Sequence, residues 1–229
     1  MKSIKKIARI VGILYLAGML FGIVGNILVQ SSLAVPEYLS SLSANNIKVA
    51  IGAMLMLMTA AWDATHGILM LPILKQHNER IAFGYFGFRI VNSVFLAIQV
   101  LFVLFQIPLA NEYLKASDHD ISYLQNLSTI FIHVNIYAYQ IAMIFVGLAS
   151  MLLCYSFYET KLIPRFIAVW GLVGYATILC GSVLEALGFD MHLIHTIPGG
   201  LWEVFTGVWL IAKGFNSSAF VPDTDTTNN

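Results

Sequence analysis

Six long apolar stretches restrict what this 229-residue sequence can fold into. A helix of about 20 apolar residues spans the hydrocarbon of a bilayer. Hydrophobic residues make up 59% of the chain and charged residues 10%, which is more apolar surface than one soluble core can bury. The stretches cover residues 7–30, 47–74, 81–107, 128–158, 163–188 and 197–215. We therefore predict an all-α, polytopic membrane protein with six transmembrane helices in one bundle.

The segments between these stretches are short and polar, so no separate soluble domain is predicted. We expect a single transmembrane domain over residues 1–216 and a disordered polar tail over residues 217–229. The first stretch follows several basic residues, as the apolar region of a signal peptide does. It runs from Ile10 to Val29, however, and a cleaved signal has only about 7–15 apolar residues. We expect this stretch to be retained as the first helix.

Basic residues indicate the orientation, because cytoplasmic loops are enriched in Lys and Arg. If the N-terminus is inside, nine of the twelve basic residues lie on the cytoplasmic side, and only Lys48 and Lys115 lie outside. The nine are Lys2, Lys5, Lys6, Arg9, Lys75, Arg80, Lys161, Arg165 and Lys213. This asymmetry predicts that both termini are cytoplasmic. Twelve acidic residues balance the basic ones, so the net charge is zero and no nucleic-acid partner is expected.

Three charged residues lie inside the predicted helices, where an isolated charge costs about 2.5–3.5 kcal/mol. Counted from the basic residue at the cytoplasmic end of each helix, Asp63 is twelve residues deep, Arg89 nine and Glu203 ten. At about 1.5 Å per residue, all three lie roughly 13–18 Å from that end, near the bilayer midplane. His66 follows Asp63 at i+3 on the same helix face. We expect the Arg89 guanidinium to bind both carboxylates, with His66 at the edge of the group.

Two interpretations of this group are open. In the first, the charges are structural ion pairs that hold the helices together. In the second, they line a pocket for a cationic or polar-headed ligand, because Trp62 and Trp202 each precede an acid and Asn92 lies one turn from Arg89. The second corresponds to a small-solute carrier or a ligand sensor. Against a carrier, no Gly or Pro interrupts the helices beside these residues.

Another polar group lies toward the predicted outer ends of the helices. Its members are His133, Asn135, Glu185, His192 and His195. Three His and one Glu are sufficient ligands for zinc, so a metal-dependent membrane hydrolase at the outer face is a third hypothesis. The pattern lacks an HExxH motif, and we expect no bound metal.

Other signatures of catalysis are missing from the sequence. There is no Walker loop, no GxSxG elbow, no CxxC pair and no dinucleotide fingerprint. Cys154 and Cys180 lie within apolar stretches and have no ligand residue beside them. We therefore predict no catalytic residue and no cofactor, and we do not expect an enzyme.

Three segments of the chain resemble the bacterial DUF4386 family of polytopic membrane proteins. They are KKIARIVGILYLAGMLFGI, LPILKQHNERIAFGYFGFRIVNS and YETKLIPRFIAVWGLVGYATILCGSVLEALG. The most recognisable elements are Ala8-Arg9-Ile10 with Gly12 and Tyr15, Phe88-Arg89-Ile90-Val91, and Leu162-Ile163-Pro164-Arg165 followed by Gly171. The resemblance covers nearly the whole chain. It implies a six-helix protein of a bacterial plasma membrane and no particular reaction. The composition predicts the lipid bilayer as a partner, and the pocket interpretation of the charged group adds a small polar or amphipathic ligand.

Overall fold

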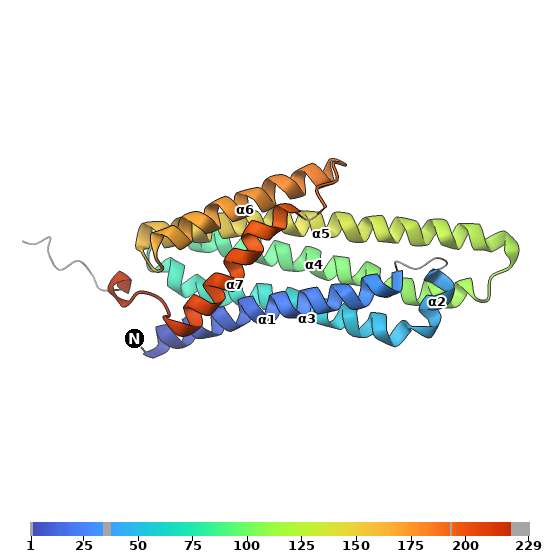
Figure 1. Ribbon diagram of the computed structural model, residues 1–229, viewed down its shortest axis with the longest axis horizontal. Helices are drawn as coiled ribbons and strands as arrows, with labels where there is room; N and C mark the ends of the chain where they lie inside the picture. The colour runs from blue at the N-terminus through green and yellow to red at the C-terminus, as the bar shows by residue number, and fades with distance from the viewer. Residues whose placement is uncertain (1, 34–37, 193, 221–229) are drawn as a thin grey trace, which may run out of the picture.

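The computed structural model describes residues 2–33, 38–192 and 194–220. Within these ranges it is almost entirely helical and contains no β-strand. The elements follow the chain as shown in Figure 1: α1 Lys2–Leu33, α2 Tyr38–Ala44, α3 Asn46–Lys75, α4 Glu79–Tyr113, α5 Asp118–Thr160, α6 Arg165–Ala186, the 3₁₀ turn η1 Ile194–Thr196, α7 Ile197–Ala212 and the 3₁₀ turn η2 Ser217–Phe220. The prediction of an all-α protein is confirmed.

Five helices, α1, α3, α4, α5 and α6, are long and apolar enough to cross a membrane. They correspond to the first five predicted spans, so the chain has the helices of a multi-pass membrane protein. The sixth predicted span corresponds to α7, which has 16 residues. At 1.5 Å per residue α7 is about 24 Å long, which is shorter than the roughly 30 Å of bilayer hydrocarbon. Its role as a span therefore does not follow from its length.

Two segments differ from the simple picture of spans and polar links. The link between the first two spans contains the short helix α2, in which Leu39 and Leu42 are buried against α3 and α4. Seven residues are too few to show a clear apolar period, so the sequence pattern did not indicate this helix. In the tail expected to be disordered, Ser217–Phe220 form η2, and residues 221–229 lie outside the described part of the chain.

Six helices form a closed ring. The contacts run from α1 to α3, then in order through α4, α5 and α6 to α7, which packs back on α1. Pairs of glycines lie at two of these contacts. A Cβ at Gly25 of α1 would lie 2.7 Å from the carbonyl oxygen of Gly52 in α3, and a Cβ at Gly12 would lie 2.6 Å from that of Gly207 in α7. Small residues at these positions allow the backbones to approach closely, as in many membrane helix contacts.

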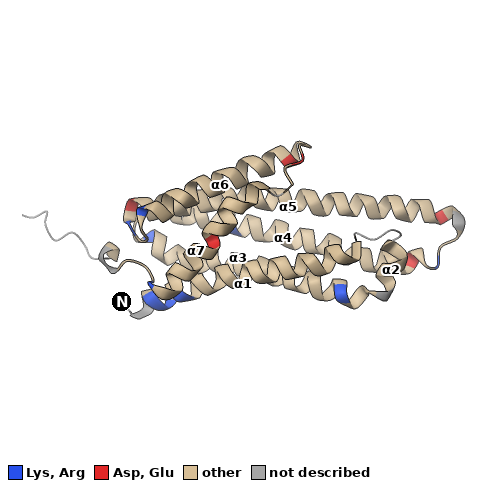
Figure 2. Cartoon of the chain, in the orientation of Figure 1, with Lys and Arg blue, Asp and Glu red and all other residues tan. Residues whose placement is uncertain are grey.

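Most Lys and Arg residues gather at the end of the bundle that holds the N-terminus (Figure 2).

The helices of the ring differ in length. Helices α4 and α5, with 35 and 43 residues, are about 52 and 65 Å long, whereas α6, with 22 residues, is about 33 Å long. As Figure 1 shows, α4 and α5 run far past α6 and α7, toward α2.

We call α2 and the adjoining ends of α1, α3, α4 and α5 the outer extension. It has its own apolar core, separate from the larger core of the ring. The buried members of this core are Val29, Leu39, Leu42, Val49, Ala53, Val100, Val103, Leu109 and Ala110. The bundle therefore contains two packed regions along its length, and the charged residues predicted to form a site belong to the ring.

Candidate functional site

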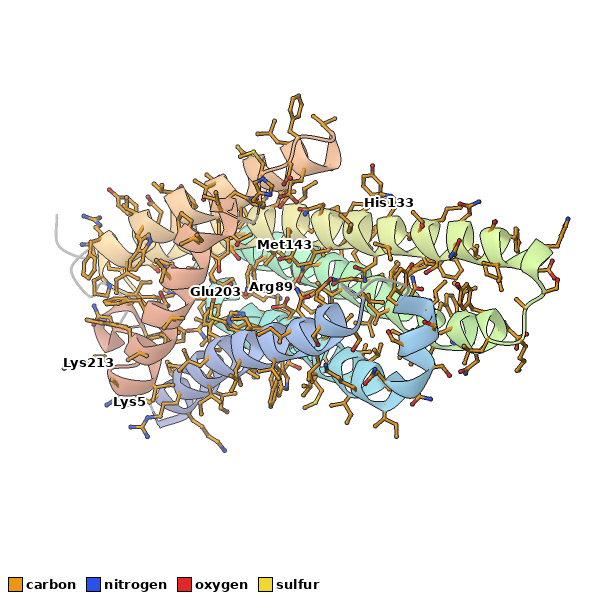
Figure 3. The ribbon with its side chains drawn as sticks, turned by 45° about the vertical axis from the view of Figure 1, so that its right-hand side comes forward. Lys5, Arg89, His133, Met143, Glu203 and Lys213 are labelled. Atoms are coloured by element: carbon orange, nitrogen blue, oxygen red, sulfur yellow. The ribbon has the colours of Figure 1, made fainter. Side chains whose placement is uncertain are left out.

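A cavity of about 380 Å³ lies inside the ring, and we call it the central cavity. Helices α1, α3, α4, α5, α6 and α7 all contribute to its wall. Trp62, Asp63, His66, Arg89 and Glu203 line it. Figure 3 shows Arg89 and Glu203 in the middle of the bundle, far from the cationic end marked by Lys5 and Lys213. The structure thus brings the four ionisable residues of the predicted group, from three helices, to one cavity.

An ion pair joins α3 to α4 at the wall of the central cavity. Arg89 Nη1 lies 2.6 Å from Asp63 Oδ1. The Arg89 side chain is 2% exposed and that of Asp63 is 24% exposed, so the guanidinium is buried while the carboxylate remains open to the cavity. Gly67 makes room for this arrangement, because a Cβ there would lie only 3.0 Å from Cβ of Arg89. The pairing offsets part of the cost of burying an isolated charge.

A tyrosine links this ion pair to His66. Arg89 Nε donates a hydrogen bond of 3.1 Å to the hydroxyl of Tyr85, which is also hydrogen-bonded to Nδ1 of His66. The His66 ring packs against Tyr15, with 4.4 Å between the ring centroids. His66 is therefore connected to the charged pair through Tyr85 rather than through Asp63, although His66 and Asp63 share one helix.

Glu203 does not pair with Arg89 as the sequence analysis expected. Among the described residues, the only ion-pair partner of Arg89 is Asp63, and Glu203 instead accepts a hydrogen bond of 2.7 Å from the Tyr175 hydroxyl. The guanidinium uses Nη1 for Asp63 and Nε for Tyr85, which directs it along the wall formed by α3 and α4. Its Nη2 is buried and has no hydrogen-bond partner within the described part of the chain. The Glu203 carboxylate is thus held by a neutral group.

Trp62 and Trp202 occupy different environments. Trp62 lines the central cavity and stacks on Phe21, with 4.7 Å between the centroids. Trp202 is fully buried, does not line the cavity, and donates a hydrogen bond of 2.6 Å from Nε1 to the carbonyl oxygen of Ile167. The expected pair of cavity tryptophans is therefore wrong for Trp202, which is a packing residue between α6 and α7.

Asn92 also lies outside the wall of the central cavity. It is buried, and its Nδ2 donates a hydrogen bond of 2.9 Å to the carbonyl oxygen of Ala142, so it links α4 to α5. The sequence placed it correctly one turn from Arg89 but gave no information on which face of α4 it occupies.

The predicted outer polar group is only partly assembled, because Glu185 and His195 lie together and the other three members lie elsewhere. Glu185 Oε1 lies 3.9 Å from Nδ1 of His195, and the second carboxylate oxygen of Glu185 accepts a hydrogen bond from Gln140. Asn135 donates to the carbonyl oxygen of Gln99 instead. His133 is exposed on α5, as Figure 3 shows, and His192 pairs with Asp190 at 2.9 Å.

The length of α5 explains why this group is dispersed. We expected the fourth span to begin near residue 128, which would place His133 and Asn135 at the outer end of the helix. The helix begins at Asp118, so these residues lie well inside it. His133 is seven residues, or about 10 Å, from Gln140, which contacts Glu185. Within the described ranges, no three His, Cys, Asp or Glu residues are arranged to hold a metal ion.

Sequence reasoning missed the tyrosines that hold the charged residues in place. Tyr85 lies four residues before Arg89, and this i,i+4 spacing was a usable signal. Tyr15 and Tyr175 lie on other helices. Tyr15 belongs to the segment that resembles the DUF4386 family, but nothing in the local sequence of either tyrosine indicates a contact with the charged residues. Their roles depend on the order of helices around the ring.

Beyond the charged residues, the central cavity continues toward the outer extension. Leu96 and Gln99 line it seven and ten residues after Arg89, or about 10 and 15 Å along α4. Ile23 and Asn26 extend the wall along α1 in the same direction, and Met143 of α5 also contributes. The cavity therefore has a charged, aromatic inner end and a mainly apolar body. Such a space suits an amphipathic molecule better than a small inorganic ion.

Comparison with known proteins identifies one family. The model of the family described as "Domain of unknown function (DUF4386)" matches residues 10–214, a range that includes the whole central cavity. No curated protein and no solved structure matches the chain.

Proposed function

We propose that this chain, which belongs to the DUF4386 family, binds a small amphipathic ligand with a cationic end in the central cavity of a membrane-embedded bundle. The observation that carries the proposal is an imbalance of charge. Asp63 and Glu203 both line the cavity, and within the described part of the chain the Arg89 guanidinium, which also lines it, forms an ion pair with Asp63 alone. A cationic ligand beside Glu203 supplies the counter-charge that the protein does not provide.

The walls of the cavity favour the same class of ligand. Aromatic rings of Tyr15, Trp62, Tyr139 and Tyr175 line it, and aromatic faces attract cations, most strongly when water is excluded. The volume of about 380 Å³ lies within the range of roughly 300–1,000 Å³ that is usual for small-molecule sites. The apolar body between Leu96 and Ile23 accommodates the hydrocarbon part of such a ligand.

A purely structural role for the charges is the second candidate. The contact between Asp63 and Arg89 and the bonds of Tyr85 to Arg89 and His66 join α3 to α4, as a structural network does. This role accounts for Arg89 but not for Glu203, whose hydrogen bond within the described part of the chain comes from the neutral Tyr175 hydroxyl. Transport is supported less, because α3, α4 and α7 continue as unbroken helices through Asp63, Arg89 and Glu203.

The proposal includes six spans with both termini on the cytoplasmic side of a bacterial plasma membrane, in one domain over residues 1–216. The gathering of basic residues at one end of the bundle supports this orientation. The position of α7 in the ring, between α6 and α1, supports its inclusion as the sixth span. Alkaline phosphatase fused after Asn216 is then inactive in a bacterial host. An active fusion there contradicts the six-span topology.

Ligand binding is tested on purified protein in a neutral detergent, with hexylammonium and hexanoate as probes of equal length and opposite charge. Hexylammonium at ten times its Kd stabilises the protein by about 1.4 kcal/mol, which corresponds to roughly 3–6 °C in Tm. Glu203→Gln is expected to abolish this shift. The matched control is Glu159→Gln, which removes an acid of α5 that does not line the cavity. Equal shifts by both probes, or a shift that survives Glu203→Gln, contradict the proposal.

A further inference from the structure

A second hollow lies at the cationic end of the bundle, far from the central cavity. It is a groove of about 550 Å³ where α5 ends, α6 begins and α7 ends. We call it the basic groove. Its polar wall contains Lys161, Arg165 and Lys213, and Trp209 forms part of its apolar wall. Figure 3 places Lys213 at this end, well separated from Arg89 and Glu203.

The basic groove carries three positive charges and no negative one. No acidic residue lines it, and within the described part of the chain none of Lys161, Arg165 and Lys213 is in an ion pair. All three side chains are exposed. The Arg165 guanidinium lies 5.0 Å from the centroid of the Tyr158 ring, a contact that orients the guanidinium and leaves its hydrogen-bond donors free. Three uncompensated cations around one concave surface favour an anion.

The backbone adds to this positive character. Arg165 is the first residue of α6, which has 22 residues, so the positive end of that helix dipole faces the groove. The Pro164 carbonyl accepts hydrogen bonds from the N–H groups of Ile167 and Ala168. The N–H groups of Arg165 and Phe166 have no acceptor among the described residues, as is usual for a helix start without a side-chain cap. Both groups are available to an anionic oxygen.

An aromatic stripe continues from the basic groove along α6 and α7. Phe205 lies 5.5 Å from Trp170, 6.4 Å from Phe166 and 6.5 Å from Trp209, measured between ring centroids. Phe166 is 61% exposed and Phe205 is 40% exposed, so the stripe forms part of the outer surface of the bundle. In a membrane protein this surface contacts lipid acyl chains.

We propose that the basic groove binds the phosphate group of an anionic phospholipid and that its acyl chains pack along the aromatic stripe. Arg165 forms a forked contact with phosphate oxygens, and Lys161 and Lys213 add point charges. Basic pockets between membrane helices on the cytoplasmic side commonly hold anionic headgroups. The aromatic stripe is the observation that favours a lipid over free phosphate, because a free ion gains nothing from it.

Native mass spectrometry of delipidated protein in a neutral detergent tests the proposal. The protein is titrated with dioleoyl phosphatidylglycerol, with dioleoyl phosphatidylcholine, and separately with inorganic phosphate. We expect one phosphatidylglycerol per chain, bound at least about tenfold more tightly than phosphatidylcholine. The combined variant Lys161→Gln, Arg165→Gln and Lys213→Gln should lose this preference. Stoichiometric binding of inorganic phosphate without a preference for phosphatidylglycerol assigns the groove to a soluble anion and overturns the lipid assignment.

A matched control separates the groove from the general charge of this end of the protein. Lys5→Gln, Lys6→Gln and Arg9→Gln together remove three exposed cations of α1 that do not line the groove. This control should retain the preference for phosphatidylglycerol within about twofold. If it loses the preference as fully as the groove variant does, a specific site is excluded.

A single substitution provides a second test in case the triple groove variant does not fold. Lys161 has a left-handed backbone with φ 55°, a conformation that suits glycine better than lysine. Lys161→Gly therefore relieves backbone strain while it removes one cation from the groove. We expect it to weaken phosphatidylglycerol binding by about fivefold without lowering Tm in detergent. Unchanged lipid affinity in this variant contradicts the proposal.

Discussion

Two buried polar networks lie at different levels of the bundle and are built differently. In the outer extension, Ser128 Oγ donates a hydrogen bond to Oε1 of Gln106, and Gln106 Nε2 donates one of 3.1 Å to the carbonyl oxygen of Ser128. The Tyr38 hydroxyl is hydrogen-bonded to Ser128 Oγ at 2.6 Å. These groups are neutral, and each buried polar atom of their side chains has a partner. In the ring, the network around Arg89 is charged, and Nη2 of Arg89 and Nε2 of His66 are buried with no partner in the described part of the chain.

The difference shows how a structural network can be distinguished from a binding network. A closed set of neutral hydrogen bonds fixes the relation of α2, α4 and α5 and requires nothing from outside the protein. The set around Arg89 instead lines a cavity, where Asp63 is 24% exposed and Glu203 has only a neutral partner. Buried polar groups that lack partners are costly in proteins. Among the described residues, buried polar atoms without a partner occur on three residues that line the central cavity, Tyr15, His66 and Arg89, and on none of the outer extension, which supports ligand binding in the ring.

The largest expected effect is that of removing Arg89. Arg89→Ala leaves Asp63 without its counter-ion and Tyr85 without a donor, so it should lower the free energy of unfolding by about 3–5 kcal/mol. Unfolding in mixed micelles with increasing dodecyl sulfate measures this change. Arg80→Ala, an exposed residue near the start of α4, should stay within about 0.5 kcal/mol of the parent. A stable Arg89→Ala protein shows that the ring does not depend on this ion pair.

An intermediate effect is expected from opening the neutral network. Gln106→Ala removes the side-chain oxygen and nitrogen that bind Oγ and the carbonyl oxygen of Ser128. The free energy of unfolding should fall by about 1–3 kcal/mol. Because Gln106 does not line the central cavity, the shift of Tm by hexylammonium should remain as in the parent. Gln125→Ala, on the exposed face of the same extension, serves as the control and should be close to neutral. Loss of the hexylammonium response in Gln106→Ala shows that the two regions are coupled.

The smallest effect on stability is expected for Glu203→Gln. The amide oxygen of Gln still accepts the hydrogen bond from Tyr175, so the free energy of unfolding should change by less than about 1 kcal/mol. The same variant should lose the response to hexylammonium. This combination, stable but unresponsive, distinguishes a binding carboxylate from a structural one. A loss of more than about 2 kcal/mol in the micelle titration shows instead that Glu203 supports the fold.

The sequence predicted depth along the helices well and predicted neighbours across them poorly. A helix rises by a fixed amount per residue, so counting from the basic ends put Asp63, Arg89 and Glu203 at one level, and all three line one cavity. Whether two residues meet also depends on the rotation of each helix and on its neighbours in the ring. That information was absent, so Glu203 was assigned to Arg89 although it contacts Tyr175, and Trp202 was placed in the cavity although it packs on Ile167.

Errors in the positions of helix ends had larger consequences. The polar residues between 118 and 127 suggested a link, but they belong to α5, where Ile121, Leu124 and Leu127 recur at helical spacing and are less exposed than the residues between them. Starting α5 ten residues late gathered His133 and Asn135 with Glu185 in the prediction, whereas the structure separates them. The short helix α2 was missed because its two buried leucines, Leu39 and Leu42, are too few to show a helical period.

The ring closes where Gly12 of the first helix meets Gly207 of the last. The chain leaves the ribosome from its N-terminus, so Gly12 is made long before Gly207. Before α7 is in place, no helix packs between α1 and α6, and the wall of the central cavity lacks Gly200 and Glu203. We therefore expect a chain truncated before residue 197 to lack the site, because α7 supplies Glu203 and closes the ring.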